Sequence, residues 1–217
     1  MAEPFTYGRR GITGRFEDAE RELLRGLFRD VVALLEPDET PDEDPLAALV
    51  GLSPNASEPE DPALFRLLPN VSKDDGEASL EFRRLTERSL RESKAGALRA
   101  AALGLESREV VLDTTAAEHW ATALTDVRLV LAERLGIRSE EDAERIHGVS
   151  DWSDVEDDDV DAYLALVYNF VTWIQTTLVD AMLSAYRAGG ETRGSSGPRP
   201  QGTEPGEEGG HGPHGQD

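Results

Sequence analysis

Residues 80–99, LEFRRLTERSLRESKAGALR, are the centre of a predicted helix that runs from about Glu77 to Leu103. Apolar residues recur along this helix at helical spacing and mark the side that we expect to be buried. These residues are Phe82, Leu85, Leu90, Leu98 and Ala102. Small residues from Ala95 onward allow another helix to pack closely, and Gly104 is a typical residue at a helix end. The stretch therefore predicts a long helix that packs among other helices.

The same stretch is strongly net-basic, although the formal net charge of the chain is −22. It carries six of the 22 lysines and arginines of the chain. They are Arg83, Arg84, Arg88, Arg91, Lys94 and Arg99. One interpretation is a solvated face with ion pairs between residues three or four apart, each worth about 0.3–0.5 kcal/mol. Lys94 and Arg99 are assigned to such a face.

A second interpretation buries part of this charge under the predicted core helix Ala116–Leu135. Arg83 or Arg84 would then lie against that helix together with Glu87. A guanidinium tolerates burial better than an ammonium, because its fork can bind a carboxylate through two hydrogen bonds. Both interpretations of the basic helix stay open.

The predicted core helix supplies partners for these arginines. It contains WATALTDVRL at 120–129, in which Asp126 and Arg128 are two residues apart and so point in different directions. Apolar residues surround both, and one of the two charges is therefore expected to border the core. The candidate ligand or partner site comprises Arg83, Arg84, Glu87, Arg91, Trp120, Asp126 and Arg128. Structural ion pairs and functional sites share this composition, so either role is open.

The remaining sequence predicts further helices and a small sheet. Apolar residues at helical spacing indicate helices at about 17–36, 62–68, 139–147 and 160–188. Short extended pieces at 5–7 and 11–16 are expected to form a hairpin, and residues 109–112 are a candidate third strand. The predicted fold class is mainly α, a helical bundle with a small two- or three-stranded β element near the N-terminus.

A single domain is expected over residues 1–188, followed by a tail over 189–217. The tail holds ten glycines and four prolines without a large apolar residue, a composition typical of disorder. Within the domain, residues 36–61 hold nine acids and no base and are interpreted as an acidic, proline-rich connection. The acidic run 154–161 lacks the glycine and the terminal glutamate of a helix–loop–helix calcium site, so it is interpreted as the solvated start of the last helix.

Composition argues against several classes of protein. The 44 acidic and 22 basic residues argue against nucleic-acid binding and against anionic membrane surfaces, because phosphate contacts need surplus cations. The chain has no cysteine, which excludes disulfides, thiolate catalysis and cysteine-bound zinc and favours a reducing, cytoplasmic setting. Residues 163–186 are the most hydrophobic stretch, but their polar residues favour a buried helix over a membrane span.

The sequence contains none of the common catalytic motifs that would indicate a reaction. The chain has no Gly-x-Ser-x-Gly, no phosphate-binding glycine loop and no Gly-x-Gly-x-x-Gly after a strand, and its four histidines lack zinc-like spacing. No catalytic, cofactor-binding or metal-ligating residue is therefore assigned, no cofactor is expected, and a non-enzymatic role is favoured.

Three segments together resemble an uncharacterised actinobacterial family of domains of unknown function. The segments are DPALFRLLP at 61–69, EFRRLTExxLRxxK at 81–94 and WxxxLTDVRL at 120–129. Genes of that family often lie beside the gene for the ClpS protease adaptor. The resemblance covers about residues 1–188 and implies a cytoplasmic, mainly helical protein, but it implies no reaction.

Three functions follow as hypotheses. The first is a non-enzymatic interaction or regulatory module with a protein partner, linked to regulated proteolysis through the resemblance. The second is a small-molecule sensor or enzyme with an arginine and carboxylate site between the two core helices. The third is a structural homodimer through the last helix, which is rich in aromatic residues. Neither nucleic acid nor a membrane is expected as a partner.

Overall fold

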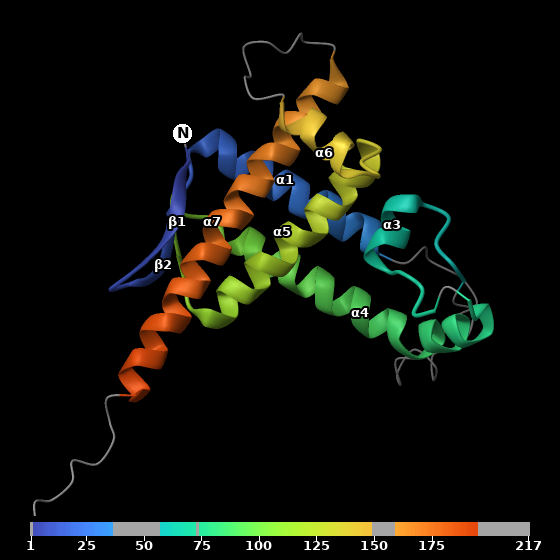
Figure 1. The fold of residues 1–217 in the computed structure, drawn as a ribbon, viewed down its shortest axis with the longest axis horizontal. Helices are drawn as coiled ribbons and strands as arrows, with labels where there is room; N and C mark the ends of the chain where they lie inside the picture. Colours follow the sequence, from blue (N-terminus) through green and yellow to red (C-terminus); the bar gives the residue numbers. More distant parts are fainter. Residues whose placement is uncertain (1, 37–56, 73, 149–158, 195–217) are drawn as a thin grey trace, which may run out of the picture.

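The computed structural model describes residues 2–36, 57–72, 74–148 and 159–194, with side chains up to Ala188 (Figure 1). In chain order the elements are β1 (Glu3–Gly8), β2 (Gly11–Arg15), α1 (Asp18–Leu35), α3 (Pro62–Leu67), α4 (Gly76–Gly104), β3 (Glu109–Leu112), α5 (Thr114–Arg134), α6 (Glu140–His147) and α7 (Val160–Gly194). Helices dominate the described residues, and the small sheet is the N-terminal β element that the sequence predicts. The predicted fold class is therefore confirmed.

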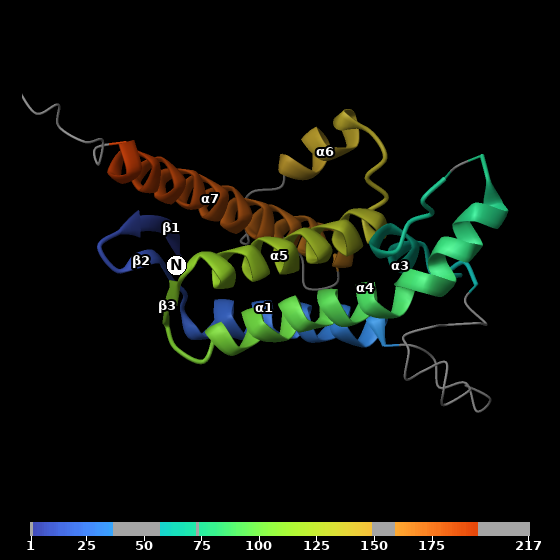
Figure 2. The same cartoon turned by 90° about the horizontal axis from the view of Figure 1, so that it is seen from below.

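The helices stack in layers. α1 packs against α4, α4 against α5, and α5 against α7. Figure 2 shows α7 on one side of α5 and both α4 and α1 on the other side, with the small sheet at one end of the stack. At least one other helix or strand separates the two helices of each pair in the sequence. Long-range packing therefore joins the layers.

Aspartates fix where three of the helices begin. Asp61, Asp75 and Asp113 precede α3, α4 and α5, and each carboxylate accepts a hydrogen bond from a backbone N–H in the first turn. These N–H groups have no partner inside the helix, so a carboxylate there stabilises the helix start and also favours the positive end of its dipole.

The sheet is antiparallel with the strand order β1-β2-β3. The backbone N–H of Phe5 donates to the Thr177 Oγ1 atom at 3.2 Å, so the outer edge of β1 lies against α7. The side chains of Phe5, Ile12 and Val110 point from the three strands into the core. The hairpin thus ties the N-terminus of the chain to its last helix.

Trp120 of α5 is the centre of the core. Its ring contacts Phe5 from β1 and Phe28 from α1 edge-on, and it stacks on Phe16, with ring centroids 5.4–6.0 Å apart. Such aromatic pairs add about 0.5–1.5 kcal/mol beyond the area that they bury. One side chain therefore joins the sheet, the first helix and the central helix.

The predicted buried side of α4 is wrong in its N-terminal half. Phe82 and Leu85 were expected in the core but are 48% and 54% exposed, and Leu90 is also exposed, whereas Arg83 is 5% exposed. Leu98 is buried as expected and Ala102 is half-buried. The reason is the helical repeat: Leu98 fixes the inward face, and residue 83, fifteen positions earlier, returns to that face, whereas residues 82 and 85 do not.

α7 continues to Gly194, so residues 189–194 of the expected tail are helical. The rest of that tail, residues 37–56 of the acidic connection and residues 154–158 of the acidic run lie outside the described residues. By length and composition alone, Val160–Ala188 could cross a membrane. The core helix of a soluble protein passes the same test, and Val171, Ile174 and Leu178 are buried in the common core.

Two glycines of α4 give a matched test of this packing. A Cβ at Gly104 would lie 3.1 Å from Trp120 Nε1, whereas a Cβ at Gly96 would meet open space. We expect Gly104→Ala to lower the free energy of unfolding by about 1–3 kcal/mol, because the core must shift around Trp120. Gly96→Ala is expected to raise it by about 0.5–1 kcal/mol, since alanine favours a helix interior. Urea unfolding followed by circular dichroism measures both, and equal effects would contradict the packing of Trp120 on Gly104.

Candidate functional site

The candidate site begins with an arginine on the inward face of α4. Arg83 donates to Glu87 Oε2 at 2.7 Å, to the backbone carbonyl of Leu68 at 2.9 Å and to Asn70 Oδ1 at 3.0 Å. The Leu68 carbonyl lies at the end of α3, where helix carbonyls have no partner inside the helix. Arg83 therefore binds the end of α3 to the first half of α4.

Glu87 is shared with a second arginine of α4. Its Oε1 accepts hydrogen bonds from Arg91 Nε at 2.8 Å and from another guanidinium nitrogen of Arg91 at 2.6 Å. Arg91 also donates to the backbone carbonyl of Leu35, the last residue of α1, at 2.9 Å. We call Arg83, Glu87 and Arg91 the arginine clamp. It binds the ends of two helices, where a positive charge also suits the helix dipole.

A third helix end is bound in the same way. Arg21 of α1 donates to the carbonyls of Leu105 and Glu106, both at 2.9 Å, just after the last residue of α4. α1 and α4 therefore each receive an arginine from the other at their C-terminal ends. The sequence analysis did not single out Arg21, because its partners are backbone atoms and no side-chain pattern marks them.

Asp126 of α5 is paired with Lys94 rather than with an arginine. The Lys94 ammonium donates to Asp126 Oδ1 at 2.6 Å, and the carboxylate is only 1% exposed. Its other oxygen, Oδ2, is buried without a hydrogen-bond partner among the described residues. Burial raises the pKa of Asp126 above that of an ordinary aspartate, and the Lys94 hydrogen bond acts in the opposite direction. Burial has the larger effect of the two.

Arg128 lies on the other side of α5 and faces α7. It donates to Gln175 Oε1 at 2.5 Å and to the Tyr168 hydroxyl at 3.3 Å, and its guanidinium carbon lies 5.5 Å from the centre of the Tyr168 ring. Such a cation over an aromatic face is attracted by the ring quadrupole. Arg128 therefore joins α5 to α7 and does not approach the arginine clamp.

The structure separates the predicted site residues into distinct places. Arg83, Glu87 and Arg91 form the arginine clamp, and Asp126 pairs with Lys94, which lies three residues beyond Arg91 on the same face of α4. Trp120 is a core residue, and Arg128 faces the opposite helix. Arg84 points outward, half-exposed, with Glu81 at 3.5 Å. No single cavity collects these side chains among the described residues.

Lys94 is the residue whose assignment changes most. It was expected on a solvated face together with Arg99, but it is largely buried against Asp126. A signal for this exists in the sequence: residues 83, 87, 91, 94, 98 and 101 recur on one helical stripe. Leu98 and Ala101 make the apolar end of that stripe, so the four charged residues before them share the inward face.

A second buried carboxylate also escaped the sequence analysis. Glu133 near the end of α5 accepts hydrogen bonds from Arg138 and from Arg66 Nε of α3, the latter at 2.8 Å. The hydrogen bond from Arg138 is the main cause that lowers the pKa of Glu133. This pair of arginines binds α3 and the loop after α5 to the core helix. Their separation in sequence, residues 66, 133 and 138, left no local pattern to find.

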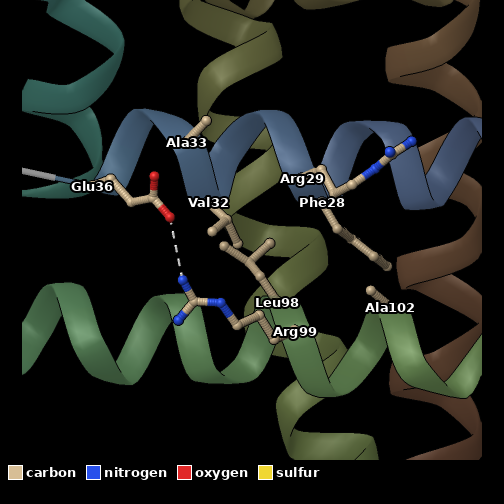
Figure 3. A pocket seen from close by; sticks show the side chains of 8 residues that line it. All are labelled: Phe28, Arg29, Val32, Ala33, Glu36, Leu98, Arg99 and Ala102. Carbon is tan, nitrogen blue, oxygen red and sulfur yellow. Dashed lines mark hydrogen bonds and ion pairs between the residues drawn. The ribbon is translucent and has the colours of Figure 1, made fainter.

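A shallow groove lies between α1 and α4, on the outside of the stack (Figure 3). Its floor is apolar and its rim is formed by Arg29, Glu36 and Arg99, with Arg99 donating to Glu36 at 3.4 Å. The groove has a volume of about 270 Å³, just below the range of about 300–1,000 Å³ that small-molecule sites occupy. Among the described residues, no three His, Asp or Glu side chains are grouped to hold a metal ion.

Comparison with known proteins gives one match. The family model described as "Domain of unknown function (DUF2017)" matches residues 2–182, which include every helix of the stack up to most of α7. No curated protein matches the chain. No solved structure matches it either. The match covers the residues that carry the arginine clamp, the Lys94–Asp126 pair and the core around Trp120.

Proposed function

The chain belongs to the DUF2017 family of domains of unknown function, and we propose that it is a non-enzymatic interaction or regulatory module. Its partner is a protein that binds the projecting first half of α4. One observation carries the proposal: Phe82 and Leu85 are exposed side by side on a helix half that buries no apolar side chain before Ala95. Aromatic residues and arginine are enriched at protein interfaces, and an exposed phenylalanine with an apolar neighbour is therefore a candidate anchor.

We call Phe82 and Leu85 the α4 outer face, and Arg84 lies beside Leu85 at its margin. Figures 1 and 2 show the first half of α4 extending past the end of α5, and Phe82 and Leu85 are exposed there. Polar contacts fix the helix half in place, since Arg83 and Ser79 are its buried side chains among the described residues. A rigid helix that presents apolar side chains loses little conformational entropy on binding.

The chemistry of the α4 outer face defines its partner. Phe82 and Leu85 fit apolar side chains of a partner helix or loop. Arg84 is half-exposed and its contact with Glu81, at 3.5 Å, is a surface ion pair worth about 0–1 kcal/mol. Arg84 can therefore exchange Glu81 for a carboxylate of the partner at little cost. The resemblance to a family encoded beside the ClpS adaptor supports regulated proteolysis as the setting.

The proposal places the partner away from the arginine clamp for a physical reason. The charged side chains of the clamp and of the Lys94–Asp126 pair bind one another and backbone carbonyls. Most of their hydrogen-bond donors are therefore already used inside the protein. The alternative of a small-molecule sensor or enzyme would need these groups to leave their partners. Leaving a buried charge unpaired costs several kcal/mol, which an anionic ligand would have to offset.

Photo-crosslinking in cells tests the α4 outer face directly. A benzophenone amino acid at position 85 is expected to give one dominant protein adduct, which mass spectrometry identifies. Leu103, also on α4 and 67% exposed, is the matched control position. Adducts of the same pattern from both positions would contradict the proposal, because they would show that position 85 meets proteins at random.

The identified partner and purified ClpS from the same organism are then titrated separately, each against the wild-type chain and against the double variant Phe82→Ser/Leu85→Ser. We expect at least about tenfold weaker binding than for the wild-type chain, since losing two hot-spot side chains costs more than about 1.4 kcal/mol. Leu103→Ser should leave the affinity unchanged. Thermal unfolding of the double variant should stay close to wild type, because exposed side chains contribute little to stability. A large loss of stability would show that the face packs against the chain itself, and would overturn the assignment.

If the crosslinked partner binds but ClpS does not, the interaction module stands and the link to this adaptor fails. If neither binds and no adduct forms, the interaction proposal fails as a whole.

A further inference from the structure

The groove between α1 and α4 is an apolar surface at which two helices meet. Phe28 and Leu98 are fully buried at its floor, and Val32 and Ala102 are half-buried beside them. Figure 3 shows the α1 side chains pointing towards the α4 side chains across the groove. Aliphatic side chains placed on this floor would be removed from water, which favours their binding.

Two arginines on the rim of the groove can accept a new partner. Arg29 is exposed, and among the described residues its hydrogen bond is to the backbone carbonyl of Arg25, at 3.3 Å. Arg99 is 60% exposed, and its 3.4 Å contact with Glu36 is a long surface ion pair, which is weak. Both guanidinium groups can therefore bind carboxylates beside the apolar floor. The occupant that fits this groove is an apolar segment with acidic residues next to it.

The chain itself contains such a segment next to the groove. Residues 37–56 lie outside the described residues, and they begin directly after Glu36, which lines the groove. Within them, the sequence LAALVGL at Leu46–Leu52 is apolar, and we call it the apolar run. Residues 37–45, just before it, hold five acids and no base. The apolar run matches the floor of the groove, and the acids before it match the arginines of the rim.

The chain before the apolar run is long enough to place it on the floor. Leu46 is ten residues after Glu36, and ten extended residues reach about 33 Å. Along α1, the groove extends only about 12 Å from Glu36 back to Phe28.

The chain after the apolar run is also long enough to return to α3. Glu58 accepts a hydrogen bond from Asn70 at 3.5 Å, and Asn70 accepts one from Arg83, so the chain is held again at the first half of α4. Nine residues lead from Leu49 to Glu58, and they reach about 30 Å. The distance along α4 from Leu98 back to Arg83 is about 22 Å.

We propose that the apolar run Leu46–Leu52 binds in the groove between α1 and α4, with acids of residues 37–45 paired to Arg29 and Arg99. The groove is separate from the α4 outer face, so this contact does not depend on the proposed partner. A short tether gives an effective concentration on the order of millimolar. A contact that would be too weak between separate molecules is therefore sufficient within one chain.

Thiol trapping in the full chain tests the contact, because the wild-type sequence has no cysteine. The trapping pair is Ala48→Cys in the apolar run with Ala102→Cys in the groove, and equilibration with a glutathione buffer measures the effective concentration of one thiol at the other. The control pair combines Ala48→Cys with Gly96→Cys, since Gly96 is exposed on α4 and a Cβ there meets open space. We expect the trapping pair to exceed the control pair by at least about tenfold.

Charge reversal tests the rim of the groove. Arg29→Glu/Arg99→Glu should lower the effective concentration of the trapping pair to that of the control pair, because the acids before the apolar run would then meet like charges. Arg9→Glu/Arg15→Glu makes the same change of net charge at two exposed positions of the hairpin. This second variant should leave the trapping pair unchanged.

A measurement on chains without cysteine provides an independent readout. Leu46→Ser/Leu49→Ser removes two apolar side chains from the apolar run. The methyl NMR signals of Val32 and Ala102 should shift between the wild-type chain and this variant. The methyl signals of Val111 on β3, which is exposed outside the groove, should stay in place.

Three outcomes overturn the proposal. Equal effective concentrations for the trapping and control pairs, or unchanged Val32 and Ala102 methyl signals, would remove the apolar run from the groove. Disulfides that join two chains rather than one, seen as a doubled mass, would show that a second copy occupies it. A trapping pair that is insensitive to Arg29→Glu/Arg99→Glu would reject the pairing of the acids with the rim.

Discussion

Replacing Arg83 with methionine is expected to lower the free energy of unfolding by about 3–5 kcal/mol. The substitution leaves the Glu87 carboxylate in a nearly buried position with Arg91 as its remaining cation, and it removes the donor from the Leu68 carbonyl at the end of α3. A nearly buried carboxylate with one ion pair fewer and an unsatisfied carbonyl both oppose folding. Urea unfolding followed by circular dichroism measures the loss.

The adjacent residue provides the matched control. Arg84→Met removes the same charge from the same helix, but Arg84 is half-exposed and its one ion pair is long. We expect a change within about 1 kcal/mol for that variant. A similar small effect of Arg83→Met and Arg84→Met would show that the arginine clamp does not hold the helices together.

Replacing Lys94 with methionine is expected to cost a similar amount, about 3–5 kcal/mol at neutral pH. Asp126 would keep its buried position and lose the Lys94 ammonium, which lies 2.6 Å away in the wild-type chain. The double variant Lys94→Met/Asp126→Leu should recover most of the loss, since two apolar side chains of similar volume often replace a buried pair without cost. Failure of the second substitution to restore stability would contradict the pairing.

The pH dependence gives an independent readout of the same pair. Because burial raises the pKa of Asp126, the folded chain keeps this proton to a higher pH than the unfolded chain does. The stabilisation from protonation is complete below the ordinary aspartate pKa and is lost as the pH rises through the raised pKa. The deficit of Lys94→Met relative to wild type should therefore shrink as the pH is lowered from 7 towards 4, where protonated Asp126 needs no cation. A deficit that is constant with pH would place its cause elsewhere.

Most of the fold was predictable because its signals are local. Helical spacing of apolar residues and the short extended pieces of the hairpin each act over a few residues. The helix boundaries, the three strands and the fold class followed from them. The inward face of α4 did not, because Phe82 and Leu85 are apolar, and burial was inferred from apolarity alone. What decided the face was packing further along the helix, at Leu98 and Ala101.

The sequence was a better guide to which charged residues lie beside the core than to the contacts that they make. The sequence pointed to Arg83, Glu87 and Arg91 on α4 and to Asp126 on α5 as charges beside the core. It did not predict the backbone partners of the two arginines, because the carbonyls at residues 35 and 68 are far away in sequence. Two-residue spacing correctly indicated that Asp126 and Arg128 point apart, and the structure places them against different helices.

The arginines at the helix ends carry a consequence for the evolution of this family. Arg21, Arg83 and Arg91 each bind a main-chain oxygen, which is present whatever amino acid stands at positions 105, 68 or 35. Leu35, Leu68 and Leu105 are buried, so core packing rather than the arginine restricts which side chain stands at those positions. Methods that infer proximity from correlated substitutions would miss these contacts. In each pair only the arginine uses its side chain, so a substitution at the acceptor position leaves the main-chain oxygen in place. In an alignment, we therefore expect conservation at positions 21, 83 and 91 without covariation with positions 105, 68 and 35.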